Sequence, residues 1–351
     1  MLIKQDESGI FDGTAGAAGL GPFEPHPWLP GGHVQTIAGR YWPLPRLRLA
    51  STAHEIALAD GDRLLVLEST PTGWDGSGPT AMLVHGLAGC ADAPYVVRLG
   101  VRLVGLGIRV IRVNLRGSGQ GFGLARGIYH AGRSDDLREV VGWLSRRHGQ
   151  SPIAAVGFSL GANLVLKLAA EAGDDPAGHG RLDCVLAANP PIDLTACARR
   201  MRAPENRLYD WNFVRWLCAM TERLHRRFPE LGPTRLRGVR TVYEFDDRYT
   251  ARRNGFASAD DYYRRCSLVT ALDRIEIPGL IVHAMDDPFI PHEPFLQAAR
   301  QPALTLELVR HGGHLGYLSR RAWQGDHRWL DARLAAWLCS QWGLEAPRPP
   351  D

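Results

Sequence analysis

The sequence has few cysteines, and their spacing excludes two kinds of site. Only six of the 351 residues are cysteines, and no two of them form a C-x-x-C pair. Zinc-ribbon sites and dithiol redox sites both need such closely spaced pairs, so we predict neither a metal nor a redox cofactor. We expect reduced, mostly buried thiols at the six positions, which are Cys90, Cys184, Cys197, Cys218, Cys266 and Cys339.

The sequence also has no apolar run long enough to cross a bilayer, which takes about 20 residues. The first twenty residues are rich in glycine and alanine and carry charges at Lys4, Asp6, Glu7 and Asp12. These charges interrupt the apolar block that a signal peptide needs. We therefore expect a flexible segment over residues 1–20, a cytoplasmic protein and no stable insertion into a membrane.

An excess of one charge is absent as well. Lysine and arginine number 41 against 37 acidic residues, which gives a net charge of +4 at neutral pH. The arginine pairs are scattered, whereas a nucleic-acid-binding segment gathers its basic residues on one face. We interpret the pairs as solvated helix faces and predict no nucleic-acid partner; they are Arg199-Arg200, Arg226-Arg227, Arg252-Arg253 and Arg320-Arg321.

A dinucleotide-binding loop is missing too. The segment Asn114–Gly121 follows a predicted strand and is rich in glycine, but its spacing is not G-x-G-x-x-G. The next predicted helix begins only at Asp135, whereas a dinucleotide loop leads directly into its helix. We interpret the segment as a loop at the rim of an active site and predict no cofactor.

What the sequence does have is an alternation of predicted strands and helices. It begins with a hairpin, His54–Ala59 and Arg63–Glu68, around the turn Asp60-Gly61-Asp62. The later strands are predicted at Thr80–His85, Ile108–Leu115, Ile153–Val156, Cys184–Asn189, Gly279–Ala284 and Leu304–Val309. The helices are predicted at Tyr95–Leu106, Asp135–Arg147 with Ser134 as its N-cap, Ala162–Ala170 and, amphipathic, Asp326–Gln341. This order predicts an α/β fold with a mostly parallel sheet, helices on both faces and the hairpin at one edge.

The alternation stops between about residue 195 and residue 268, where only helices and loops are predicted. This stretch contains an aromatic cluster within Tyr209–Trp216. An insertion between two parallel strands lies at the carboxyl ends of the strands, where such folds place their sites. We therefore predict one α/β domain over residues 21–350, with a helical cap inserted at about 195–268.

The most informative motif is Gly157-Phe158-Ser159-Leu160-Gly161, which fits the G-x-S-x-G nucleophile elbow. An apolar stretch short enough for a buried strand precedes it, and a run of helix formers follows it. A serine on such a turn projects its hydroxyl above the sheet. The motif therefore predicts Ser159 as a nucleophile.

A serine nucleophile needs a histidine base, and in this order of elements the base comes last. The strand Leu304–Val309 runs into His311-Gly312-Gly313-His314. We favour His314, because the two glycines before it allow the loop to turn back over the sheet. His311 is the alternative, and a metal site made by the two histidines is not expected because no carboxylate lies beside them in the sequence.

The base needs an acid to orient it. The strand Gly279–Ala284 leads into Asp286 and Asp287, and we favour Asp287 because it stands where the strand gives way to a proline. Its neighbour Asp286 points in a different direction, and Asp193 follows an earlier strand. Both are left open as alternatives.

An oxyanion hole needs two backbone N–H groups. One comes from the residue after the nucleophile, Leu160. The other comes from the loop after an earlier strand, and His85-Gly86-Leu87-Ala88-Gly89 follows the strand that begins at Thr80. We predict the N–H groups of Leu87 and Leu160 as the pair.

Taken together, these residues resemble the YheT-like branch of the α/β-hydrolases, which is related to eukaryotic α/β-hydrolase-domain lipases and esterases. The resemblance extends from about Phe23 to the final helix, and its most specific part is the N-terminal stretch Phe23–Ile37, which generic hydrolases lack. For residues Trp28–Ile37 of that stretch we can derive no role beyond packing across the sheet edge. The other segments that carry the resemblance are His85–Gly89, Asn114–Gly117, Glu244–Asp247 with Thr250, Asp261–Tyr263 with Ser267, Asp286–Phe289 and His311–His314.

The resemblance implies Ser159, Asp287 and His314 as a catalytic triad and the hydrolysis of carboxylic esters, either short-chain or acyl-lipid, without a cofactor. The related eukaryotic proteins carry a membrane anchor, which we do not expect here. A thioester or lactone hydrolase and an acyltransferase are alternatives on the same site, and a non-catalytic binding protein on this scaffold is a third. Neither the acyl chain and alcohol of the substrate nor the oligomeric state follows from the sequence.

Overall fold

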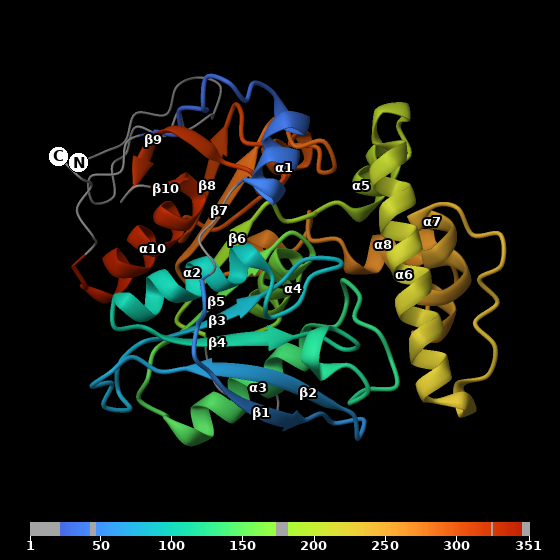
Figure 1. The fold of residues 1–351 in the computed structure, drawn as a ribbon, viewed down its shortest axis with the longest axis horizontal. Coiled ribbons are helices and arrows are strands. Elements are labelled where there is room, and N and C mark those ends of the chain that lie inside the picture. The colour runs from blue at the N-terminus through green and yellow to red at the C-terminus, as the bar shows by residue number, and fades with distance from the viewer. Residues whose placement is uncertain (1–21, 43–46, 173–181, 324–325, 346–351) are drawn as a thin grey trace.

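The computed structural model describes residues 22–42, 47–172, 182–323 and 326–345 (Figure 1). Its centre is an eight-stranded sheet in the order β1-β2-β4-β3-β5-β6-β7-β8, and from β4 to β8 the strands are parallel, as the alternation predicted. The segment 1–20, which we expected to be flexible, lies outside the described residues. The strands are β1 (Thr52–Ala57), β2 (Arg63–Ser69), β3 (Thr80–Val84), β4 (Arg109–Asn114), β5 (Ile153–Phe158), β6 (Cys184–Ala188), β7 (Gly279–Ala284) and β8 (Leu304–Val309).

The predicted hairpin forms one edge of the sheet. β1 and β2 pair in antiparallel register from Thr52 opposite Glu68 to Ala57 opposite Arg63. Gly61 in the turn between them has φ 84°, a left-handed conformation that favours glycine. β2 in turn pairs antiparallel with β4, so the hairpin extends the parallel part of the sheet.

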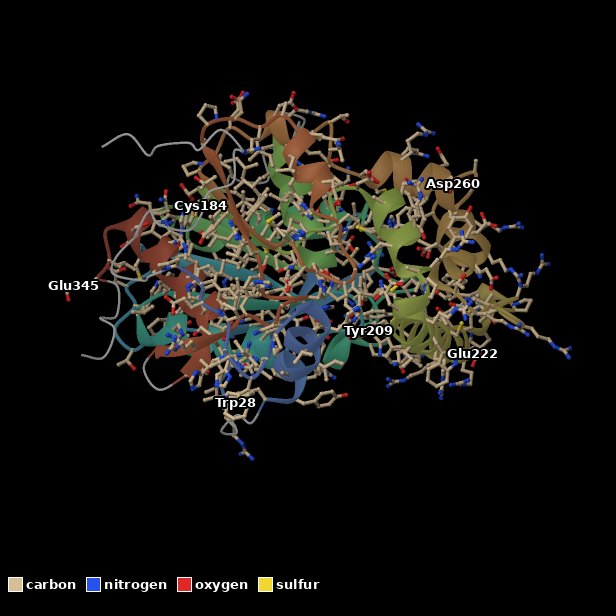
Figure 2. All side chains as sticks on the ribbon, turned by 90° about the horizontal axis from the view of Figure 1, so that it is seen from above. Trp28, Cys184, Tyr209, Glu222, Asp260 and Glu345 are labelled. Atoms are coloured by element: carbon tan, nitrogen blue, oxygen red, sulfur yellow. The ribbon has the colours of Figure 1, made fainter. Side chains whose placement is uncertain are left out.

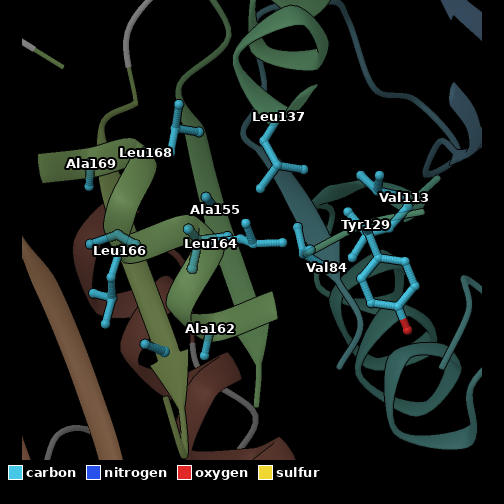
Figure 3. Close-up of a cluster of buried hydrophobic side chains, with 14 of the residues drawn as sticks. Val84, Val113, Tyr129, Leu137, Ala155, Ala162, Leu164, Leu166, Leu168 and Ala169 are labelled. Carbon is cyan, nitrogen blue, oxygen red and sulfur yellow. The ribbon is translucent and has the colours of Figure 1, made fainter. Parts of the chain in front are cut away.

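Helices cover both faces of the sheet because its strands are apolar on both sides. Along β3, Ala81 and Leu83 belong to a buried cluster with α2 and α10, whereas Met82 and Val84 belong to a second cluster with α3 and α4. Successive strand side chains point to opposite faces, which separates the two clusters. Figure 3 shows part of the second cluster, including Val84 and Leu164. The helices are α2 (Pro94–Gly105), α3 (Ser134–Arg147), α4 (Leu160–Ala170) and α10 (Trp329–Trp342).

The predicted N-cap of α3 is wrong. The helix begins at Ser134 itself, and Arg133 occupies the N-cap position without a side-chain hydrogen bond to the helix. The Ser134 hydroxyl instead donates to a carboxylate oxygen of Glu171, which follows α4, at 2.6 Å. A hydroxyl donates readily to a charged acceptor, and this contact links the start of α3 to the end of α4.

The last helix also differs from the prediction. α10 begins at Trp329 rather than Asp326, and nearly all of its residues as far as Cys339 are buried, so it is not amphipathic. It packs against α2 and against a two-stranded ribbon that the sequence did not reveal. This ribbon consists of β9 (Leu318–Trp323) and β10 (Asp326–Arg328).

Between β6 and β7 the chain forms the expected insertion of helices and turns, without a strand in residues 189–278, all of which are described. Figure 1 shows its helices as a layer beyond the tips of the β3 and β4 arrows. No helix in the described ranges has the length and apolar character needed to cross a membrane. The helices of the insertion are α5 (Leu194–Met201), α6 (Arg207–Arg227), α7 (Val242–Phe245) and α8 (Ala259–Cys266).

Candidate active site

Ser159 lies at the sharp turn between β5 and α4. Its backbone has φ 52° and ψ −121°, a region that residues with a side chain rarely adopt. The flanking glycines make the turn possible: a Cβ on Gly157 would overlap the carbonyl oxygen of Gly161, and a Cβ on Gly161 would overlap that of His85. The turn therefore holds the serine hydroxyl at the carboxyl end of β5, next to the N-terminus of α4.

His314 lies in the loop between β8 and β9 and contacts two of the predicted site residues. Its Nε2 is 2.9 Å from Ser159 Oγ, and its Nδ1 is 2.8 Å from Asp287 Oδ2. An ionised carboxylate can only accept a hydrogen bond, so Nδ1 carries the ring proton and Nε2 accepts from the serine hydroxyl. The side chain of His314 is 12% exposed, which leaves Nε2 within reach of a bound molecule.

Asp287 follows β7, and its carboxylate is buried and surrounded by hydrogen-bond donors. Its Oδ1 accepts from the backbone N–H groups of Phe289 and Ile290, at 2.8 and 3.1 Å. Its Oδ2 accepts from the side-chain amide of Asn189 at 2.6 Å in addition to His314. Burial alone would raise the pKa of this carboxyl, but the His314 imidazole and the Phe289 N–H hold it below its ordinary value of 3.8. The carboxyl is therefore ionised at neutral pH.

The alternative acids and the alternative base have other partners. His311 pairs with Asp286 through Nδ1 and Oδ2, which are 3.3 Å apart. The second oxygen of Asp286 accepts from the Gly313 N–H at 2.8 Å. Asp193 accepts from the Ala196 N–H at 2.9 Å and so caps the N-terminus of α5. The structure brings Asp287, not Asp286 or Asp193, to His314.

Two backbone N–H groups at this site have no acceptor among the described residues: those of Leu87 and Leu160. Leu160 is the first residue of α4, so its N–H adds to the positive end of the helix dipole. The N–H groups on either side of Leu87 donate to the hydroxyls of Tyr95 and Tyr129, at 3.0 and 2.8 Å. The two tyrosines fix the loop and leave the Leu87 N–H free for a ligand.

Asn189 is a site residue to which the sequence analysis gave no role. Its side-chain amide donates to Asp287 Oδ2 and to the carbonyl oxygen of Gly313, at 2.6 and 3.2 Å. Its side-chain oxygen accepts from the Tyr317 hydroxyl at 2.7 Å. Asn189 thus joins the loop of the acid to the loop of the base. Its place at the carboxyl end of a central strand was the signal that could have identified it.

Ser159, His314, Leu87 and Leu160 line one cavity of about 150 Å³. The opposite wall comes from the insertion between β6 and β7, so the insertion closes the site on the side away from the sheet. Besides polar residues (Arg202, Asp210, Asp246, Thr250, Tyr243, Tyr262 and Tyr263), this wall carries apolar side chains. They are Leu194, Cys197, Met201, Phe213, Leu217 and Val242, joined by Phe289 and Ile290 after β7.

Of the predicted aromatic cluster within Tyr209–Trp216, one residue lines the cavity. Phe213 lines the cavity, whereas Trp211 is 48% exposed and Trp216 packs near Tyr129, with ring centroids 6.5 Å apart. On α6, residues four apart share a face, which places Phe213 and Leu217 together and turns Trp211 outward. Trp211 therefore lies outside the cavity wall.

The cysteines form no disulfide in the part of the chain that the structure describes, and all six are free. The described part of the chain also contains no group of three or more histidine, cysteine, aspartate or glutamate side chains that could hold a metal ion. Cys197 lines the cavity, and burial raises the pKa of its thiol well above the ordinary value. This thiol is therefore protonated at neutral pH and a weak nucleophile.

We expect His85, which precedes the Leu87 loop, to make the fold sensitive to acid. His85 is fully buried, its Nδ1–H donates to the Gly86 carbonyl at 2.7 Å, and its Nε2 accepts from the Leu115 N–H at 3.3 Å. Burial lowers its pKa from 6.5 to about 4, only partly offset by the Gly86 carbonyl. Between pH 6.5 and pH 4 the imidazole of His85 therefore binds a proton in the unfolded chain but not in the folded chain. The free energy of unfolding that is present above pH 6.5 is lost as the pH falls toward 4.

This loss is on the order of 3 kcal/mol for His85 alone. Urea unfolding between pH 7 and pH 4.5 measures it, and a His85→Gln variant, whose amide does not titrate, should show a shallower dependence of the unfolding free energy on pH. The same slope in variant and wild type would contradict this explanation. His130 and His283, whose pKa values are lowered by burial to about 3 and about 4, contribute in the same direction in both proteins.

Sequence relatives match most of the chain. YheT of Escherichia coli (strain K12), an esterase by name, is 33% identical over 311 residues, which are 87% of this chain and 89% of that protein. Medium-chain fatty acid ethyl ester synthase/esterase 2 of Saccharomyces cerevisiae and phospholipase ABHD3 of Mus musculus are each 28% identical, over 69% and 68% of this chain. The chain spans 58% of the length of each of these two relatives.

Solved structures show the same fold at lower identity. The Pyrococcus furiosus esterase Pf2001 has a TM-score of 0.53 and 18% identity, and covers 79% of this chain and 87% of its own. The 2,6-dihydroxy-pseudo-oxynicotine hydrolase has a TM-score of 0.56 and 18% identity, and the match covers 91% of this chain and 74% of that chain. The family model described as alpha/beta hydrolase fold matches residues 79–320, which include Ser159, Asp287 and His314. The chain therefore belongs to the α/β hydrolase family and, within it, to the branch of esterases and lipases that includes YheT.

Proposed function

We propose that this α/β hydrolase cleaves carboxylic esters with Ser159 as nucleophile, His314 as base and Asp287 as the acid that orients the base. The observation that carries the proposal is the pair of hydrogen bonds on His314, one to Ser159 Oγ at 2.9 Å and one to Asp287 Oδ2 at 2.8 Å. A serine hydroxyl that donates to a neutral imidazole, which in turn donates to a buried carboxylate, is the arrangement that activates serine.

The reaction runs in two halves. As Ser159 Oγ attacks the ester carbonyl carbon, its proton moves to His314 Nε2 and the carbonyl oxygen becomes an oxyanion. The oxyanion lies at the free N–H groups of Leu87 and Leu160. The C–O bond to the alcohol then breaks, Nε2–H gives its proton to the leaving alkoxide, and an acyl-serine is formed. Water then attacks the acyl carbon and gives a proton to Nε2; the bond from this carbon to Ser159 Oγ breaks, Oγ takes the proton back from Nε2, and the acid leaves.

Asp287 acts through His314. It holds the Nδ1–H tautomer in the resting enzyme, so that Nε2 is free to take the serine proton. It also stabilises the positive charge on the imidazole after the proton has moved. Because the pKa of its carboxyl lies below 3.8, Asp287 is charged at neutral pH.

We further propose that the helical insertion, residues of about 195–268, is the cap that selects the substrate. Its apolar side chains form the cavity wall opposite Ser159. The cavity of about 150 Å³, which is open on one side, has room for a molecule about the size of benzene, with roughly six carbon atoms. The volume therefore favours esters of short acyl chains, and longer chains fit only if they leave the cavity through its open side.

Phe213 should set the acyl length. In a Phe213→Ala variant the wall opposite Ser159 loses a ring, so longer chains gain space. We expect the ratio of kcat/KM for p-nitrophenyl octanoate to that for the butyrate to rise roughly tenfold, the scale of methylene discrimination in an apolar pocket. Trp211→Ala, on the same helix but facing outward, is the control and should leave the ratio unchanged. Equal changes in the two variants would contradict a role of Phe213 in the wall.

The experiment that tests the proposed function is labelling by a fluorophosphonate probe together with a panel of p-nitrophenyl esters from acetate to laurate. The probe should modify Ser159, identified by peptide mass spectrometry, and a panel ester should be hydrolysed. A folded protein that neither reacts with the probe nor turns over any ester would support a binding protein instead. Thioesters and lactones in the same panel distinguish those hydrolases from an esterase.

A second candidate is acyl transfer to an alcohol. One observation favours it: the yeast relative that matches 69% of this chain is named as both an ethyl ester synthase and an esterase. Chemically, an alcohol replaces water as the acceptor of the acyl group from Ser159, with His314 taking its proton. Product analysis with added ethanol separates the two, because a transferase forms the ethyl ester in water, whereas a hydrolase releases only the acid.

A further inference from the structure

The helix α1 (Gly32–Tyr41) begins within the N-terminal stretch to which the sequence analysis assigned no role, and it lies against the loop that carries His314. Its one buried side chain is Gln35, which is fully inaccessible. The Gln35 amide nitrogen donates to the carbonyl oxygens of Leu29 and Leu318, both at 3.1 Å, and its oxygen accepts from the Leu318 N–H at 2.8 Å. The Gln35 side chain therefore binds both the N–H group and the carbonyl oxygen of Leu318, the residue at which β9 begins.

The next residue, Thr36, binds His314 itself. Its hydroxyl oxygen accepts from the His314 backbone N–H at 2.8 Å and donates to the Gly32 carbonyl at 2.6 Å. The second bond orients the hydroxyl, so that its lone pair faces His314. Only two rotatable bonds separate the His314 backbone from its imidazole ring, and a shift of this N–H therefore moves the ring as well.

At three glycines, the backbone of α1 lies directly against the backbone of the loops that carry His314 and Asp287. A Cβ on Gly313 would overlap the Gly32 carbonyl oxygen, and a Cβ on Gly316 would overlap that of Gln35. A Cβ on Gly32 would overlap the Asp286 carbonyl oxygen, next to the acid. Backbone packed directly on backbone leaves no flexible group to absorb a displacement, so movement of α1 passes to the loop.

Contacts at both ends hold α1 in place. At its C-terminal end, the buried guanidinium of Arg328 donates to the carbonyl oxygens of Gly39 and Trp42, at 2.7 and 3.3 Å. Burial lowers the pKa of Arg328 to about 10, so it is still charged at neutral pH, and a cation is favourable at this end of a helix. Near its N-terminal end, the ring of His33 stacks on Tyr209 of α6, with centroids 5.7 Å apart, and Figure 2 shows Tyr209 beside the blue ribbon of α1.

We propose that α1 is a positioning element for the catalytic base, with Thr36 as the residue that fixes His314 and Gln35 as the residue that fixes the strand after it. The inference rests on the proposed function, in which His314 is the base. His314 must keep two hydrogen bonds at once, to Ser159 and to Asp287, and both weaken steeply with displacement. Misplacement of the reacting groups costs rate even when the substrate still binds.

Thr36→Val tests the inference, because valine keeps the shape of threonine and removes the hydroxyl. We expect kcat for p-nitrophenyl butyrate to fall roughly tenfold, the effect of one hydrogen bond, while KM changes less than about twofold. The rate of fluorophosphonate labelling should fall by the same factor as kcat. Thr36→Ser, which keeps the hydroxyl, should restore both rates, and Val34→Ala on the exposed face of α1 should change neither.

The controls separate the possible failures. Rates are given per folded molecule, from the circular dichroism signal and the melting temperature of each variant, so a loss of fold is not counted as a loss of catalysis. Unchanged kcat in Thr36→Val, or an equal loss in Thr36→Val and Thr36→Ser, overturns the positioning role. A Ser159→Ala variant in the same series tests the proposed function separately: if it retains turnover, the proposed function fails, and the positioning of a base has no meaning.

Discussion

A Ser159→Ala variant is expected to lose ester hydrolysis by about 10⁴- to 10⁶-fold, because a triad acts as a unit and the loss of its nucleophile removes the covalent route. The fold should stay intact. Alanine keeps the Cβ and the unusual backbone angles of position 159, and the only interaction removed is the hydrogen bond from Oγ to His314 Nε2. The measurement is kcat for p-nitrophenyl butyrate, alongside the melting temperature and fluorophosphonate labelling.

Ser340→Ala is a matched control for this variant. Ser340 is exposed near the end of α10 and donates only locally, to the Trp337 carbonyl. It should retain full activity and labelling. Wild-type turnover in Ser159→Ala would rule out a serine mechanism, whereas lost turnover with a lower melting temperature in both variants would point to general instability of the protein.

Asp287→Asn is expected to lower kcat by up to about 10⁴-fold with little change in shape. All four groups that contact this carboxylate are donors: the N–H groups of Phe289 and Ile290 on one oxygen, and Asn189 and His314 on the other. An asparagine must turn its NH₂ group toward one of these pairs. When it faces His314 it favours the wrong tautomer, in which Nε2 carries the proton and cannot accept one from the serine.

Asp286→Asn and Asp193→Asn are the controls for the acid. Asparagine at position 193 can still cap α5, since asparagine is a good N-cap residue. Asparagine at position 286 keeps one oxygen for the Gly313 N–H. Both variants should therefore lose far less activity than Asp287→Asn. A loss in either that equals the loss in Asp287→Asn would show that the base is oriented by a different carboxylate.

The parts of the fold that could be predicted from the sequence are those fixed by local chemistry. The strand, turn and helix around Ser159 could be placed because apolar runs, helix formers and two glycines with no room for a Cβ lie within a few residues of one another. The hairpin at the sheet edge was predictable for the same reason, from a glycine turn between two alternating stretches. The parallel order of the strands followed from their alternation with helices.

What could not be predicted depends on distant partners. The sequence left three aspartates open as the acid, and the choice of Asp287 by geometry depends on Asn189, 98 residues away, and on the direction in which the chain turns after β7. Ser134 was assigned as a helix cap because Glu171 is not visible as its partner from local sequence. The role proposed for Thr36 depends on His314, 278 residues further along.

The pairing of Gln35 with Leu318, which are 283 residues apart, has a consequence for the order in which the protein is made. At a synthesis rate of 5–20 residues per second, α1 leaves the ribosome roughly 15 to 60 s before its partner does. In the later part of that interval the elbow serine is already synthesised, but the growing chain has neither His314 nor the strand β9 that follows it. The triad proposed here can therefore be assembled only after translation has passed β9.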